Sequence, residues 1–273
     1  MDHDHASPPL TARRVAIGSA SNVVGRSVGL ATWFLLTPYI LGRLGPVDYG
    51  IWVLVGVLGS YGFLLDLGVA GAVVKYVAEY RARDDWDTAH DLVATSLRVY
   101  MVLGAAAVLL AVGAAIAIPV VLRIPEAQHE ATSWAIFLVG LSIGASLAFM
   151  PATSTLKGIQ RYDLYNLVVT TGTLLTAALT VAVLASGGGL VAMVAVNVPV
   201  TILMQLVSVV VVRRVAPELR FGWRGGGRSQ VRMITRFSGA ARFAATEGQG
   251  LAHSTKERLR TLALSLCEAG IGS

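Results

Sequence analysis

A run of 49 consecutive residues without a charged side chain, Leu164–Val212, constrains this chain more than any other feature. A helix needs about 20 apolar residues to cross a hydrocarbon core about 30 Å thick, so the run is long enough for two crossings. Two shorter uncharged runs cover Val99–Leu122 and Ala131–Leu156. Only 14% of the 273 residues are charged and the mean hydropathy is +0.66, which leaves too few charges for a water-exposed surface. We therefore predict an all-α, multi-pass membrane protein and exclude soluble enzymes as the main interpretation.

The pattern of apolar runs predicts a six-helix transmembrane bundle. The expected spans are about 15–41, 49–80, 99–122, 132–156, 164–185 and 190–212. A turn is expected at 42–46, a charged loop at 81–91 and a kink at Pro151, while Asp66-Leu67-Gly68 interrupts the second span. The resulting organisation is a polar cytoplasmic lead over 1–14, the bundle over 15–213, and a basic cytoplasmic linker with a poorly packed tail over 214–273.

Basic residues flanking the spans predict the orientation, because they are enriched in cytoplasmic connections. With the N-terminus inside, the external connections hold only Arg43 and Arg123. The cytoplasmic connections then hold Arg13, Arg14, Lys75, Arg81, Arg83, Lys157, Arg161, Arg213 and Arg214. The segment 213–273 carries 11 basic and four acidic side chains, and we expect it to face the anionic inner leaflet. No recognition motif accompanies this charge, so no nucleic-acid partner is expected.

Three polar residues inside the spans are the candidate substrate-binding residues: Arg26, Asp66 and Asn22. A charge within a span costs a few kcal/mol and normally faces a cavity or a partner. Arg26 and Asp66 fall at comparable depths, so one interpretation is a buried ion pair that fixes the first two spans. In the other, Arg26 lines a hydrophilic cavity and attracts an anionic ligand, with Asp66 tuning it or taking a coupling ion. Asn22 is open to interhelical hydrogen bonding or to ligand contact.

The sequence offers no catalytic residues, no metal site and no cofactor site. Cys267 is the only cysteine, and away from their ends the spans contain one carboxylate, Asp66, where an intramembrane enzyme needs paired acid and base groups. The glycine-rich stretch 224–229 lacks the spacing and the lysine of a phosphate-binding loop. Glycines four residues apart, at Gly25 and Gly29 and at Gly140 and Gly144, permit close helix packing, either within this chain or across a dimer face.

Several local motifs resemble a known family in their residues and in their order. They are Thr37–Pro46, Asp48–Trp52, Leu64–Gly68, Val74–Tyr80 and Leu156–Asp163. Residues 12–238 resemble the N-terminal half of bacterial polysaccharide-biosynthesis membrane proteins, the O-antigen and oligosaccharide flippases. These belong to the multidrug/oligosaccharidyl-lipid/polysaccharide exporter superfamily.

The resemblance implies one lobe of a two-lobed transporter in the bacterial inner membrane. Its substrate would be a polyprenyl-pyrophosphate-linked glycan, with Arg26 meeting the pyrophosphate and with polysaccharide-assembly enzymes as possible partners. Because the apolar pattern of a second bundle is missing after about Gly239, a frameshift or truncation is expected in preference to a genuine half-size protein. Two alternatives stay open: a drug or small-solute exporter of the same superfamily, and a non-transporting fragment or scaffold.

Overall fold

The computed structural model describes residues 12–60, 62, 66 and 68–219, with side chains described from Ser21 onward. The expected lead up to residue 11 and the tail beyond Leu219 lie outside this part of the chain. Within it the fold is all-α and contains no strand. The helices are α1 (Ala12–Ser60), α2 (Val69–Ala82), α3 (Trp86–Val121), α4 (Glu126–Ala148), α5 (Met150–Gly158), α6 (Tyr162–Ala185), α7 (Leu190–Ala195) and α8 (Asn197–Val215).

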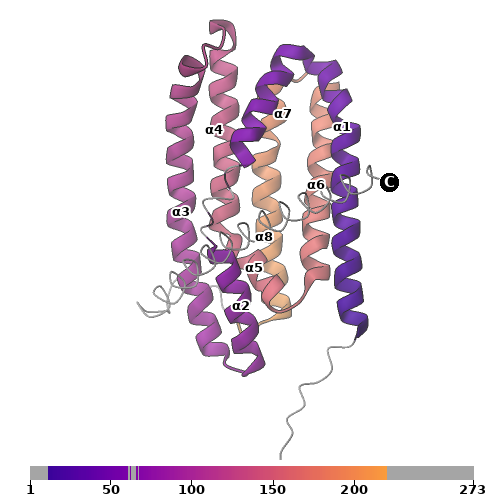
Figure 1. The fold of residues 1–273 in the computed structure, drawn as a ribbon, viewed down its shortest axis with the longest axis vertical. Coiled ribbons are helices and arrows are strands. Elements are labelled where there is room, and N and C mark those ends of the chain that lie inside the picture. Colours follow the sequence, from indigo (N-terminus) through magenta and orange to yellow (C-terminus); the bar gives the residue numbers. More distant parts are fainter. Residues whose placement is uncertain (1–11, 61, 63–65, 67, 220–273) are drawn as a thin grey trace, which may run out of the picture.

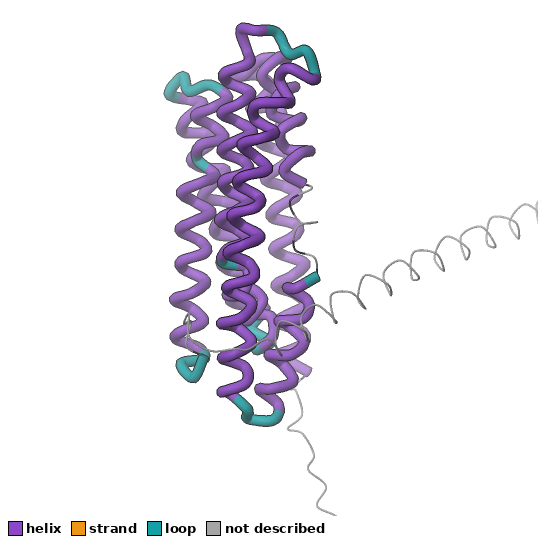
Figure 2. Tube along the Cα trace, turned by 90° about the vertical axis from the view of Figure 1, so that its left-hand side faces the viewer, coloured by secondary structure: helices purple, strands orange, loops and turns teal. Residues whose placement is uncertain are grey.

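The helices form an elongated bundle whose members run along one long axis (Figures 1 and 2). The α2–α3 and α5–α6 connections lie at one end, called the lower end here after Figure 1, and the α3–α4 and α6–α7 connections lie at the upper end. Among the residues that the structure describes, five helical stretches are long and apolar enough to cross a membrane: 21–60, 86–121, 126–148, 162–185 and 190–215. The first of them folds back on itself, so residues 12–219 make six passes along the bundle, the number that the sequence predicts. The fold is that of a polytopic all-α membrane protein.

α1 contains a kink at Gly45. This residue has φ 77° and ψ 173°, a backbone conformation that residues with a Cβ rarely adopt, and Pro46 follows it. The turn expected over 42–46 is thus confirmed as a sharp reversal between two helical limbs. The first limb, 12–44, rises to the upper end, and the second limb, 46–60, descends from it (Figure 1).

The second pass is a discontinuous helix. The second limb of α1 ends at Ser60 and α2 begins at Val69, after Gly68 in a left-handed conformation with φ 79°. The interruption predicted around Asp66 is therefore confirmed. Asp66 lies at the break between the two helical halves of this pass.

The prediction of a charged loop over 81–91 is wrong. α2 continues to Ala82 and α3 already begins at Trp86, because the Asp85 carboxylate accepts a hydrogen bond from the Thr88 backbone N–H at 3.1 Å and caps the helix. Hydropathy marks where a helix enters lipid, but an N-cap lets the helix start several residues earlier, in water. α3 consequently has 36 residues, about 54 Å, and extends beyond a single bilayer core.

The expected kink at Pro151 is confirmed as a break between α4 and α5 at Phe149. Pro151 stands in the first turn of α5, where its missing backbone N–H costs no helical hydrogen bond. The last pass, which contains Pro199, divides in the same way into α7 and α8.

Tight packing between α3 and α4 depends on glycine. A Cβ on Gly104 would lie 2.6 Å from the Gly144 carbonyl oxygen, and a Cβ on Gly144 would lie 2.9 Å from the Gly104 oxygen. Gly140 meets Ala111 of α3 in the same seam. The Gly140–Gly144 spacing therefore serves packing within this chain, one of the two alternatives left by the sequence. Gly25 likewise contacts α6, whereas no atom lies within 4 Å of a Cβ placed on Gly29.

The basic residues predicted to be cytoplasmic and those predicted to be external lie at opposite ends of the bundle. Arg83 and Arg161 lie at the lower end, and Arg43 and Arg123 lie at the upper end. We expect the lower end to be cytoplasmic. In a Cys267→Ser background, a cysteine at exposed Ser186 should react with a membrane-impermeant maleimide added outside intact cells. A cysteine at exposed Arg83 should react only after permeabilisation, and the reverse pattern would overturn the orientation.

Candidate substrate-binding face

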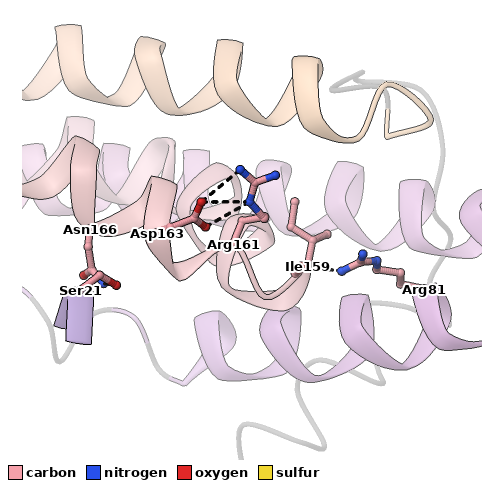
Figure 3. Close-up of polar contacts among 6 residues, drawn as sticks. All are labelled: Ser21, Arg81, Ile159, Arg161, Asp163 and Asn166. Carbon is pink, nitrogen blue, oxygen red and sulfur yellow. Dashed lines mark hydrogen bonds and ion pairs between the residues drawn. The ribbon is translucent and has the colours of Figure 1, made fainter. Parts of the chain in front are cut away.

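The first limb of α1 lies beside α6 along most of its length. Near the lower end, the Asn166 side-chain amide donates a hydrogen bond to the Ser21 hydroxyl at 3.0 Å (Figure 3). A Cβ on Gly25 would lie 3.3 Å from the Thr170 hydroxyl oxygen. Near the upper end, the Tyr39 hydroxyl donates to the Val181 carbonyl at 3.4 Å. Because these contacts pair residues of the two helices, the depth of a residue on α1 can be measured by its distance from the ends of α6.

Arg26 lies close to the middle of the bundle by this measure. α6 has 24 residues and is about 36 Å long, so its midpoint is about 18 Å from either end. Thr170, the neighbour of Gly25, is eight residues or about 12 Å from the start of α6. Arg26 is thus about 5 Å below the midpoint, well inside a core about 30 Å thick.

The Arg26 side chain is exposed on the surface of this isolated bundle, and so is Asn22 one helical turn below it. Within the described part of the chain, no hydrogen bond or ion pair involves Arg26. Large exposed apolar side chains surround the pair, including Val23 at 65% and Leu30 at 74% exposure. A bare arginine in lipid costs about 2.5–3.5 kcal/mol or more, so this face requires water, protein or a ligand against it.

Asp66 is not part of that face. Its carboxylate accepts hydrogen bonds from the Tyr100 hydroxyl and, at 3.1 Å, from the Ala70 backbone N–H in the first turn of α2. Tyr100 is fully buried in α3. The structure therefore does not form the Arg26–Asp66 ion pair considered from the sequence, since the carboxylate is held by α2 and α3 while Arg26 lies exposed on α1. Tyr100, the buried partner of Asp66, was missed because its contact spans 34 residues.

Polar residues at the lower end are held by structural contacts. The Arg161 Nε lies 3.1 Å from an Asp163 oxygen, and the Arg81 guanidinium donates to the Ile159 carbonyl (Figure 3). The Lys157 ammonium lies 4.1 Å from the centre of the Tyr165 ring. These cations stabilise the ends of α2, α5 and α6, and they are separate from the midplane position of Arg26.

The other Asn and Gln side chains within the spans form hydrogen bonds either to a different helix or within their own pass. Asn166 bonds Ser21 of α1, and Gln205 of α8 donates to the Ser146 carbonyl of α4 at 3.3 Å, as expected for interhelical contacts. Asn197 instead donates to the Val194 carbonyl within its own pass.

A stacked pair of indoles lies above Arg26 and was missed by sequence analysis. Trp33 of the first limb and Trp52 of the second have ring centroids 5.4 Å apart and an interplanar angle of 20°. Tyr49 also packs on Trp52, with centroids 5.4 Å apart and an interplanar angle of 54°. Only the reversal at Gly45 brings these rings together, and no local pattern predicts which residues of the two limbs lie opposite each other. Among the described residues, no group of three or more His, Cys, Asp or Glu side chains is placed to hold a metal ion.

Comparison with known proteins supports the fold. No family model matches the sequence, and no curated protein matches it significantly. A solved structure does match: a MOP superfamily transporter from Pyrococcus furiosus, described as having a binding pocket of reversed polarity that suggests a different function. The TM-score is 0.65 at 14% sequence identity, over 82% of this chain and 50% of that one. The chain has the fold of part of a MOP superfamily transporter. It spans about half the length of that protein.

Proposed function

We propose that this chain is the N-terminal bundle of a membrane transporter that moves a polyprenyl-pyrophosphate-linked oligosaccharide across the bacterial inner membrane. One observation carries the proposal: Arg26 is exposed near the midplane, with Asn22 one turn below it, on a bundle with the fold of a MOP superfamily transporter. A guanidinium at that depth binds phosphate oxygens strongly, because little water competes for its N–H donors.

The polarity of the face favours an anionic substrate over a cationic drug. A drug-binding face would present a free carboxylate, but Asp66 already accepts hydrogen bonds from Tyr100 and Ala70. The charged side chains that the structure describes on the first limb are both cations, Arg26 near the midplane and Arg43 at the upper end. A lipid-linked pyrophosphate also suits this location, since its polyprenyl chain remains among the exposed apolar side chains while its phosphates reach the guanidinium.

Binding to the purified full chain in nanodiscs tests the proposal. A fluorescent polyprenyl pyrophosphate should bind saturably, and the corresponding uncharged polyprenol should not compete for the site. A lipophilic cationic dye should not compete either. Equal competition by the polyprenol would show that only the apolar chain is recognised and would contradict the proposal. Flipping activity is then measured in proteoliposomes that contain the chain together with whatever second bundle completes it.

A further inference from the structure

The Trp33–Trp52 pair differs from an ordinary membrane-interface anchor. Trp33 is seven residues, about 10 Å, above Arg26 and therefore about 6 Å above the midpoint of α6. Interfacial tryptophans lie at the headgroups, about 15 Å from the midplane. Trp33 is nevertheless 59% exposed. One face of its ring is covered by Trp52, so much of the exposure belongs to the opposite face.

Trp33 and Arg26 share one side of the first limb. Seven residues make almost two complete turns of an α-helix, so the two side chains are displaced by only about 20° around its axis. Between them lies Gly29, and no atom lies within 4 Å of a Cβ built on it. Along about 10 Å of this helix face, the cation Arg26 is followed by Gly29, which has no side chain, and then by the aromatic ring of Trp33.

From this line we infer that the Trp33–Trp52 pair is a sugar-binding platform that reads the first rings of the glycan while Arg26 holds the pyrophosphate. The inference rests on the proposed function and adds what selects the substrate. A pyranose ring has an apolar face of C–H groups that packs on an indole, with its hydroxyl groups directed to water. In a polyprenyl-pyrophosphate glycan the first sugar is bonded directly to the phosphate, so its first rings fall along the line from Arg26 to Trp33.

Stacking prepares the platform for binding. Trp52 holds the Trp33 ring in one orientation, and Tyr49 supports Trp52, so little side-chain freedom remains to be lost when a ring docks. Aromatic contacts of this kind add modest energy beyond the area that they bury. The platform is therefore expected to contribute a preference for glycosylated lipid, on top of pyrophosphate binding that does not depend on it.

The test compares two probes on the full chain in nanodiscs: polyprenyl pyrophosphate and the same lipid carrying a disaccharide. We expect wild type to bind the glycosylated probe about tenfold more tightly, and Trp33→Ala to bind both probes equally, at the wild-type affinity for the bare one. Trp33→Phe keeps an aromatic ring and should retain part of the preference. Trp134→Ala is the matched control, because Trp134 is 51% exposed and pairs with Phe137 of its own helix, α4, rather than with Trp52.

Each outcome bears on one claim. If wild type binds the two probes equally, or if Trp33→Ala keeps the full preference, the sugar-binding role of the Trp33–Trp52 pair is wrong. The proposed binding of pyrophosphate is not contradicted by either result. If Trp33→Ala weakens both probes by the same factor, the ring has a packing role and the inference is overturned. If wild type binds neither probe, the proposed function itself fails. Trp33→Phe keeps the test valid should the alanine variant fold poorly.

Discussion

Arg26→Ala should weaken binding of polyprenyl pyrophosphate to this chain by about 10- to 100-fold. A hydrogen bond to a charged group contributes about 1.5–3 kcal/mol, and each 1.4 kcal/mol is a factor of ten in affinity. Arg26 is the basic side chain exposed near the midplane, and no other described residue holds it. The loss should appear in titrations of the nanodisc-embedded chain with the fluorescent lipid.

Two variants separate this role from general electrostatics. Arg26→Lys should recover part of the affinity, because an ammonium keeps the charge but lacks the planar fork that binds two phosphate oxygens. Arg98→Ala removes another exposed arginine, which lies on α3 and not on α1, and should leave affinity unchanged. Equal losses in Arg26→Ala and Arg98→Ala would mean that the lipid responds only to the net charge of the bundle.

Gly104→Ala should clearly destabilise the bundle at the seam between α3 and α4. Its Cβ would lie 2.6 Å from the Gly144 carbonyl oxygen, a backbone atom that cannot rotate away, so α3 and α4 would have to separate. Overpacking of this kind costs about 1–3 kcal/mol, and separation of the helices also loosens the neighbouring contact at Gly140. Thermal unfolding of the purified chain in detergent should show a clearly lower midpoint.

Gly113→Ala provides the matched control on the same helix. No atom lies within 4 Å of a Cβ at Gly113, and alanine is favoured over glycine inside a helix by up to about 1 kcal/mol. This variant should unfold at the wild-type temperature or slightly above it. A comparable fall in both variants would indicate that α3 tolerates no substitution for reasons other than the α4 seam.

Much of the fold followed from hydropathy, charge and turn residues. The uncharged runs predicted the passes, because a helix is the structure by which a single apolar segment satisfies its backbone in lipid. Gly45-Pro46, Asp66-Leu67-Gly68 and Pro151 marked a reversal and two breaks that the structure contains. The loop over 81–91 was predicted wrongly, because hydropathy does not register a helix that continues into water beyond an Asp85 cap.

The candidate site also has features that were predictable from the sequence and features that were not. Hydropathy was enough to place Arg26 and Asp66 within spans, where a charge is costly whatever the helix packing. Their neighbours depend on that packing: Asp66 accepts hydrogen bonds from Tyr100 and Ala70, Arg26 is left exposed, and Trp33 stacks on Trp52. Local sequence determines which face of a helix is polar. Which partner meets that face depends on the rotation and packing of helices that are distant in the chain.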